Sequence, residues 1–248
     1  MRANRPCRRP YQSVRAWACA ALAALACCSA ALANDRPFLI TSSAVIEDDN
    51  EGTWGLESWW QRVGPRRALT VAPEYNFNPF NSLQLLYTQL NDGTTREPNR
   101  NLEVEFKHVL NDIARDGHGW GVHLSLDGAN TPGAGWRTER LAARMLYTLA
   151  LASPFSAGDA TLHLNAGIGK SRDQRREWIG SVVFEHRLPW RTHAFVEIGR
   201  EDRATLLHTG LRHWVKRDRY AVDVGVQQLR GDGRRDGGVV IGFGWYDF

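Results

Sequence analysis

The chain has 248 residues, with 31 Lys and Arg against 27 Asp and Glu, four Cys and a formal net charge of +4. Five arginines and all four cysteines lie in the first 28 residues, so the rest of the chain holds 26 basic residues (31 less five) against 27 acidic ones. This excludes a disulfide-stapled mature domain and removes the electrostatic argument for a nucleic-acid partner.

The first 33 residues have the three parts of a secretory signal peptide. Residues 1–15 are basic and contain no acid, Ala16–Ala30 is apolar, and Ala31-Leu32-Ala33 is a small-residue cleavage site. We expect cleavage after Ala33, which leaves residues 34–248 as one exported domain. The compartment that follows from this is the cell envelope of a Gram-negative bacterium.

Two alternatives to a cleaved leader remain at this point. An N-terminal membrane anchor is one, although the Ala-rich run is barely long enough to span a bilayer. A lipoprotein is the other, because the residues before Cys28 loosely resemble a lipidation site, with Cys27 as the residue that does not fit.

Several segments after the leader alternate strictly between apolar and polar residues. The segment Gly119–Leu126 places a Trp, a Val and two Leu on one face and two Gly, a His and a Ser on the other. The same alternation occurs in residues 102–107, 161–168 and 220–227. Strict alternation indicates a strand with one apolar and one polar face, and about ten residues is the length with which a tilted strand crosses a bilayer.

Clusters of Gly, Pro, Asn, Asp and Arg separate these segments at a regular pace, which is typical of hairpin turns. The turns are expected at 63–67, 76–81, 91–100, 111–119, 127–135, 153–159, 171–175, 186–190, 200–203, 216–219 and 231–237. The pattern predicts an all-β fold, a transmembrane antiparallel up-and-down β-barrel of about 12 strands. Only Leu141–Leu151 is also compatible with a helix when taken alone.

A soluble periplasmic β-barrel or sandwich with its apolar faces turned inward is the alternative fold. The small residues and charges on the polar faces favour a lumen, and the apolar faces then require lipid. Nine tryptophans follow the leader, most of them near strand ends, where an interfacial girdle would place them. We therefore expect the outer membrane as the location and its lipid as a partner.

The last residues contain aromatic side chains at positions 246 and 248. A final strand that ends in Phe248, with Tyr246 two residues earlier, resembles the assembly signal of outer-membrane barrels and implies the barrel-assembly machinery as a partner. Val239, Ile241 and Phe243 fall on the other parity. We therefore expect a bulge in this strand, or lipid-facing glycines at positions 242 and 244.

One pair of residues supports a catalytic hypothesis. His123-x-Ser125 is similar to the His-x-Ser pair of two barrel-hydrolase families, the outer-membrane phospholipases and the lipid A deacylases. Leu126 stands where those families have an asparagine, and alternation places His123 and Ser125 in the lumen instead of facing lipid. A lipid or ester hydrolase is thus an alternative, and lumen lining is the interpretation we favour.

The polar faces carry a mixed set of charges that point inward on the predicted strands. The residues expected to line the lumen are Glu57, Glu103, Glu105, Lys107, His123, Arg144, His163, Glu185, Glu197 and Asp223. A second group with the same orientation is Glu74, Arg140, Glu177, His208 and Arg212. Such a lining either selects permeants or fills a narrow barrel with a salt-bridge network. No metal-binding spacing is present after the leader, and no cofactor is expected.

In overall layout the chain resembles small transporter-like outer-membrane barrels of the MetA-type phenol-degradation family. The residues that carry the resemblance are Gly52-Thr53-Trp54 at the first strand, Phe106-Lys107-His108 at the end of a later one, the short hairpins and the terminal Phe248. The resemblance implies passage or binding of small solutes and no catalytic residue. A structural barrel with a filled lumen is the remaining alternative.

Overall fold

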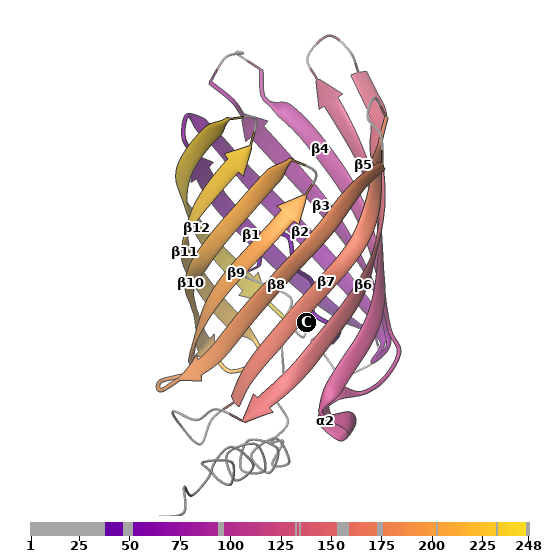
Figure 1. Ribbon diagram of the computed structural model, residues 1–248, viewed down its shortest axis with the longest axis vertical. Coiled ribbons are helices and arrows are strands. Elements are labelled where there is room, and N and C mark those ends of the chain that lie inside the picture. The colour runs from indigo at the N-terminus through magenta and orange to yellow at the C-terminus, as the bar shows by residue number, and fades with distance from the viewer. Residues whose placement is uncertain are drawn as a thin grey trace, which may run out of the picture.

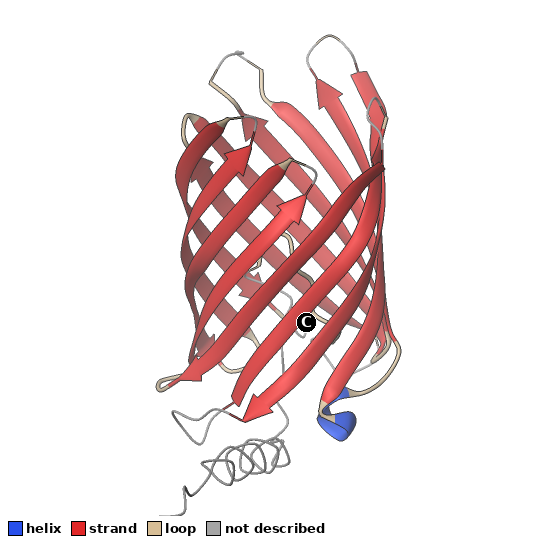
Figure 2. Cartoon of the chain, in the orientation of Figure 1, coloured by secondary structure: helices blue, strands red, loops and turns tan. Residues whose placement is uncertain are grey.

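The structure, a computed structural model, describes residues 38–46, 52–93, 97–131, 133, 135–152, 159–172, 176–201, 203–231 and 233–246. The predicted signal peptide and Phe248 lie outside these residues. Within them, twelve strands form one closed barrel (Figures 1 and 2). The strands are β1 Thr53–Val63, β2 Arg66–Asn78, β3 Asn81–Asn91, β4 Asn99–Val109, β5 His118–Thr131, β6 Gly135–Ala152, β7 Asp159–Ser171, β8 Arg176–Leu188, β9 Thr192–Glu201, β10 Ala204–Lys216, β11 Tyr220–Gly231 and β12 Arg234–Trp245.

Every strand pairs with the next one in antiparallel fashion, and β1 pairs with β12 to close the barrel, with Leu56 opposite Trp245 and Val63 opposite Gly238. This confirms the predicted all-β, up-and-down barrel. We call the end where β1 begins and β12 finishes the lower end, and the opposite end the upper end, as in Figure 1.

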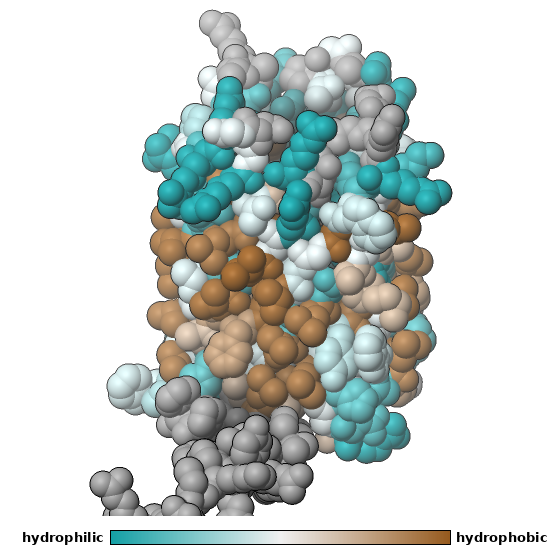
Figure 3. Space-filling view, viewed as in Figure 1, coloured by the Kyte–Doolittle hydropathy of each residue, from teal (hydrophilic) through white to brown (hydrophobic). Residues whose placement is uncertain are grey.

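The alternating sequence places apolar side chains on the outside of the wall. In β11, Val222, Val224 and Val226 are 42–56% exposed, whereas Asp223 and Gln227 on the opposite face are buried. Figure 3 shows the apolar side chains over the lower and middle part of one face and hydrophilic side chains at the upper end. The outer surface of the wall is thus apolar and the interior is polar, which is the opposite of the soluble alternative.

Several local expectations need correction. The segment Leu141–Leu151 belongs to strand β6 and not to a helix. Trp214 does not join an outer girdle: it is buried inside the barrel against Tyr246. Trp59 also points inward, where it lines a cavity. Both exceptions follow from strand parity, because each residue shares its face with polar inward residues.

The last strand contains neither the predicted bulge nor lipid-facing glycines. Its register with β1 and β11 is continuous, Gly242 and Gly244 are buried, and Phe243 between them is exposed. The strand ends at Trp245, and Tyr246 then turns inward, where its hydroxyl donates a hydrogen bond to Glu57 (2.6 Å). Tyr246 has the same parity as Gly242 and Gly244 and faces inward as they do, so the described residues contain no conflict of parity.

One short helix, α2 (Ile113–Asp116), lies in the connection between β4 and β5 at the lower end. Asp112 caps it by accepting a hydrogen bond from the Ala114 N–H (2.8 Å), and Gly117 ends it with φ at +73°, a conformation that favours glycine. No helix among the described residues has the length and apolar character to span a membrane.

Candidate functional site

Residues Phe38–Ile46, which we call the inner segment, lie inside the barrel. They precede β1 and form no strand, yet five of the nine are buried. Leu39 to Thr41 contact β9, and Ile46 lines a cavity near α2 at the lower end. The inner segment therefore reaches into the lumen and comes back toward the lower end, where β1 begins.

The carboxylate of Glu197 on β9 holds the first part of the inner segment. It accepts hydrogen bonds from the backbone N–H groups of Leu39 (2.8 Å), Ile40 (2.9 Å) and Thr41 (2.8 Å), and it lies 3.2 Å from Nδ1 of His208. Glu197 has no exposed surface. A buried carboxylate needs such a full set of donors to offset its loss of water.

Other strands hold the rest of the inner segment. The side chain of Asn165 on β7 both accepts from the Ser42 N–H (2.7 Å) and donates to the Ser42 carbonyl (2.8 Å). The hydroxyl of Thr148 on β6 accepts from the Ala44 N–H (2.8 Å). Lys107 on β4 donates to the carbonyl of Val45 (3.0 Å). The side chains of the wall thus satisfy backbone N–H and C=O groups of a segment that belongs to no sheet.

Two glycines make room for the inner segment. A Cβ at Gly119 on β5 would lie 2.6 Å from the carbonyl oxygen of Ala44, and one at Gly199 on β9 would lie 3.0 Å from Cδ1 of Ile40. Real Cβ atoms essentially never lie as close to another heavy atom as the 2.6 Å at Gly119. The inner segment therefore fits closely against the wall because residues 119 and 199 are glycines.

Below Glu197, aromatic and charged groups fill the lumen. Phe38 packs against Phe195 and His163, with ring centroids 5.6 and 5.2 Å apart. Arg212 forms a two-bond ion pair with Asp223 (2.8 and 3.0 Å). These side chains close the part of the interior next to β9–β12.

Above the inner segment lies a cavity of about 380 Å³, which we call the vestibule. Residues 39–42 form part of its lining, together with Trp59, Gln61, Glu103 and Glu105. A second cavity, of about 320 Å³, is lined by residues 44–46 and by residues of the β4–β5 connection. The inner segment contributes to both cavities and stands between them.

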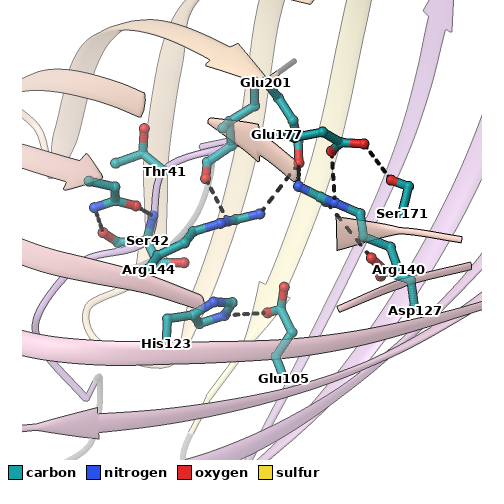
Figure 4. Close-up of polar contacts among 12 residues, drawn as sticks. Thr41, Ser42, Glu105, His123, Asp127, Arg140, Arg144, Ser171, Glu177 and Glu201 are labelled. Carbon is teal, nitrogen blue, oxygen red and sulfur yellow. Dashed lines mark hydrogen bonds and ion pairs between the residues drawn. The ribbon is translucent and has the colours of Figure 1, made fainter. Parts of the chain in front are cut away.

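The charged wall of the vestibule is organised around two arginines (Figure 4). Arg140 forms ion pairs with Glu201, Glu177 (3.4 Å) and Asp127 (3.8 Å). Arg144 lies 3.8 Å from the same Glu201 and also donates to the carbonyl of Ile40 (3.0 Å). Arg144 thus connects the vestibule wall to the inner segment. Carboxyl groups outnumber guanidinium groups in this wall.

The pair singled out for catalysis lies on the inner face of β5. His123 Nε2 is 3.3 Å from a carboxylate oxygen of Glu105, and both His123 and Ser125 are buried. Within the described residues, neither ring nitrogen of His123 nor the Ser125 hydroxyl has a hydrogen-bond partner. A nucleophilic serine needs its base within hydrogen-bond reach, and this geometry does not provide it. No group of three possible metal ligands occurs in the described part of the chain.

No protein-family model matches the chain, and no curated protein is similar to it in sequence. Solved structures, in contrast, share the fold. The barrel is similar to that of the KdgM porin. The two chains are 8% identical, with a TM-score of 0.58 over 77% of this chain and 98% of the porin. The NanC porin is also 8% identical, with a TM-score of 0.51 over 77% of this chain and 98% of that one.

At these identities the likeness to KdgM and NanC concerns the fold alone. On this KdgM-like barrel all ten residues expected to line the lumen lie on the inner faces of their strands, with Glu103 and Glu105 half-buried and the others buried. The sequence analysis missed the inner segment. The available signals were its apolar character just after the leader and the glycines at 119 and 199 on inward faces.

Proposed function

We propose that the protein is an outer-membrane channel that admits small solutes into its vestibule and conducts them when the inner segment leaves the lumen. The observation that carries the proposal is the position of the inner segment between two cavities of about 380 and 320 Å³. The outward apolar band and the porin-like barrel support the membrane location.

The mode of attachment supports a segment that can be displaced. The polar contacts of the inner segment with the wall are hydrogen bonds with side chains on separate strands, and none of them belongs to the strand ladder. Removing the segment therefore breaks no strand pairing of the barrel. The excess of carboxyl groups in the wall of the vestibule favours cations and neutral polar solutes over anions.

The resemblance to MetA-type phenol-degradation barrels supports small molecules as permeants. We propose uptake or export of such molecules as the role, with insertion by the barrel-assembly machinery directed by the terminal aromatic residues. The ten inward residues named above would then line the path, and Arg144 would both line the path and contact the inner segment.

Single-channel recording in planar bilayers tests this function. We compare the mature chain with a variant that lacks residues 38–46 and with Gly119→Ala, whose added Cβ would collide with the Ala44 carbonyl. Both variants should show long open steps and cation selectivity in a KCl gradient, whereas the parent should be mostly closed. Arg217→Gln, on an exposed turn at the lower end, is the matched control and should behave as the parent.

A deletion variant that is folded but never conducts would contradict the proposal and favour a structural barrel with a filled lumen. Folding is checked independently by the shift in gel mobility on boiling, so a silent variant is not mistaken for a misfolded one.

A further inference from the structure

Three pairs of basic residues face each other across neighbouring strands at the upper end. Arg62 on β1 is opposite Arg67 on β2, and Lys170 on β7 is opposite Arg176 on β8. The third pair is Arg230 on β11 and Arg235 on β12. We call these the basic pairs. All six side chains are exposed, and the parity of their strands directs them outward, away from the lumen.

Like charges directly opposite each other destabilise an antiparallel ladder. The described part of the chain does not offset this repulsion, because none of the six residues forms an ion pair there. Arg62 Nε donates to the carbonyl of Gly64 (3.3 Å), and Arg230 Nε donates to Gln228 (3.2 Å). These neutral acceptors leave the positive charges in place.

The carboxylates of the upper end are turned elsewhere. Asp127, Glu177 and Glu201 point into the lumen and pair with Arg140, and Asp236 is half-buried beside Gly64. Among the described residues of this end, Glu97 is the acidic residue with an exposed side chain. Among the described residues, the outer face of the six strands that carry the basic pairs is therefore positive at the upper end, while the acidic side chains of these strands do not share that face.

Two of the three basic pairs directly border the apolar band. Two residues nearer the middle of the barrel, the same strands expose Trp60 (36%) and Leu69 (49%) below the first pair. Ile168 (46%) and Trp178 (79%) occupy the same positions below the second pair. The basic side chains and the apolar side chains below them are two residues apart along the strand, which is only about 7 Å. A ligand that contacts both must carry an anionic group next to a hydrocarbon chain.

We propose that the basic pairs bind the phosphate groups of anionic lipids in the membrane leaflet at the upper end. Two guanidinium groups, or a guanidinium and an ammonium group, give a phosphate several charge-assisted hydrogen bonds at once. Lipid binding at three places around the wall would also remove the repulsion within each pair. The inference rests on the membrane placement of the proposed function and not on conduction.

Native mass spectrometry of the mature chain in neutral detergent tests the proposal. The protein is titrated with phosphatidylglycerol or with phosphatidylcholine of identical acyl chains. Phosphatidylglycerol should bind with clear preference, and Arg62→Gln with Arg67→Gln should weaken the binding of one lipid roughly 10-fold. Substituting all six residues by Gln should abolish the preference. The control variant removes two exposed charges at the lower end, Arg191→Gln with Arg217→Gln, and should retain it.

Equal binding of the two lipids by the parent would overturn the proposal, as would an equal loss in the control variant. Glycerol 3-phosphate at the same concentration should not displace the lipid, and displacement would assign the sites to soluble phosphate compounds instead. The six-fold variant is also recorded in planar bilayers after deletion of residues 38–46. Conductance with lost lipid preference supports both proposals, and conductance with unaltered preference overturns only this one.

Discussion

Glu197 shows how a single buried side chain can hold several residues of a segment inside the lumen. Its carboxylate accepts hydrogen bonds from three backbone N–H groups of the inner segment and lies beside His208. A hydrogen bond to a charged group contributes about 1.5–3 kcal/mol, so this one residue holds a large part of the attachment free energy. A glutamine amide at the same position would direct its own NH₂ group toward backbone N–H groups, which are also donors.

We therefore expect Glu197→Gln to loosen the inner segment without opening the wall. Hydrogen exchange at the amides of Leu39, Ile40 and Thr41 should accelerate about 10- to 100-fold, as the loss of one charged acceptor predicts. The amides of β9 should be unaffected. Glu177→Gln is the control, because Glu177 pairs with Arg140 and Ser171 and makes no hydrogen bond to the inner segment. Unchanged exchange in Glu197→Gln would show that other contacts carry the attachment.

At the scale of elements, the alternation of residues predicted the strands and their faces because that signal is local. Val222 and Asp223 on β11 take opposite faces as their positions require. The inner segment has no such alternation, and its partners lie 62 to 158 residues later in the chain. The position of the inner segment depends on how the barrel closes, and so does the pairing of Arg140 with three carboxylates. No local sequence pattern encodes that closure.

The aromatic residues show the same boundary between local and tertiary signals. Tryptophans at strand ends are typical of a membrane interface, but Trp214 has the inward parity of Arg212 and lies inside, where Arg212 and Tyr246 pack against it. Tyr246 in turn is fixed by its hydrogen bond to Glu57. The parity of Tyr246 was visible in the sequence, whereas the end of the strand at Trp245 was not.

Helix α2 allows a prediction about pH at the lower end. The hydrogen bond from Arg115, with a second one from Asn111, lowers the pKa of Asp116 from its ordinary 3.8 to about 2. A carboxylate with a lowered pKa stabilises the folded connection above pH 3.8 and loses this effect as the pH falls toward 2. The ¹³C shift of the Asp116 carboxyl should thus titrate near pH 2 and move upward in Arg115→Gln. A midpoint near 4 in the parent would contradict the ion pair.

At the scale of the whole molecule, the closed ladder and the outward apolar band predict a resistant barrel. Each strand is paired on both sides, so no edge is available for unfolding to begin. The chain without residues 1–33 should need detergent for solubility and should migrate faster on a gel before boiling than after it. A chain that stays soluble without detergent, or that migrates identically in both cases, would show that the apolar face does not meet lipid.

The partners of the inner segment come from β4, β6, β7 and β9, on separate parts of the wall. These partners form a common surface only after the strands have curved into the barrel. Residues 38–46 precede every strand in the sequence, yet they are among the last to find their contacts. Contacts between residues far apart in sequence form late because chain closure must precede them. Docking of this stretch is thus a final folding step, and its reversal can proceed while the completed wall stays intact.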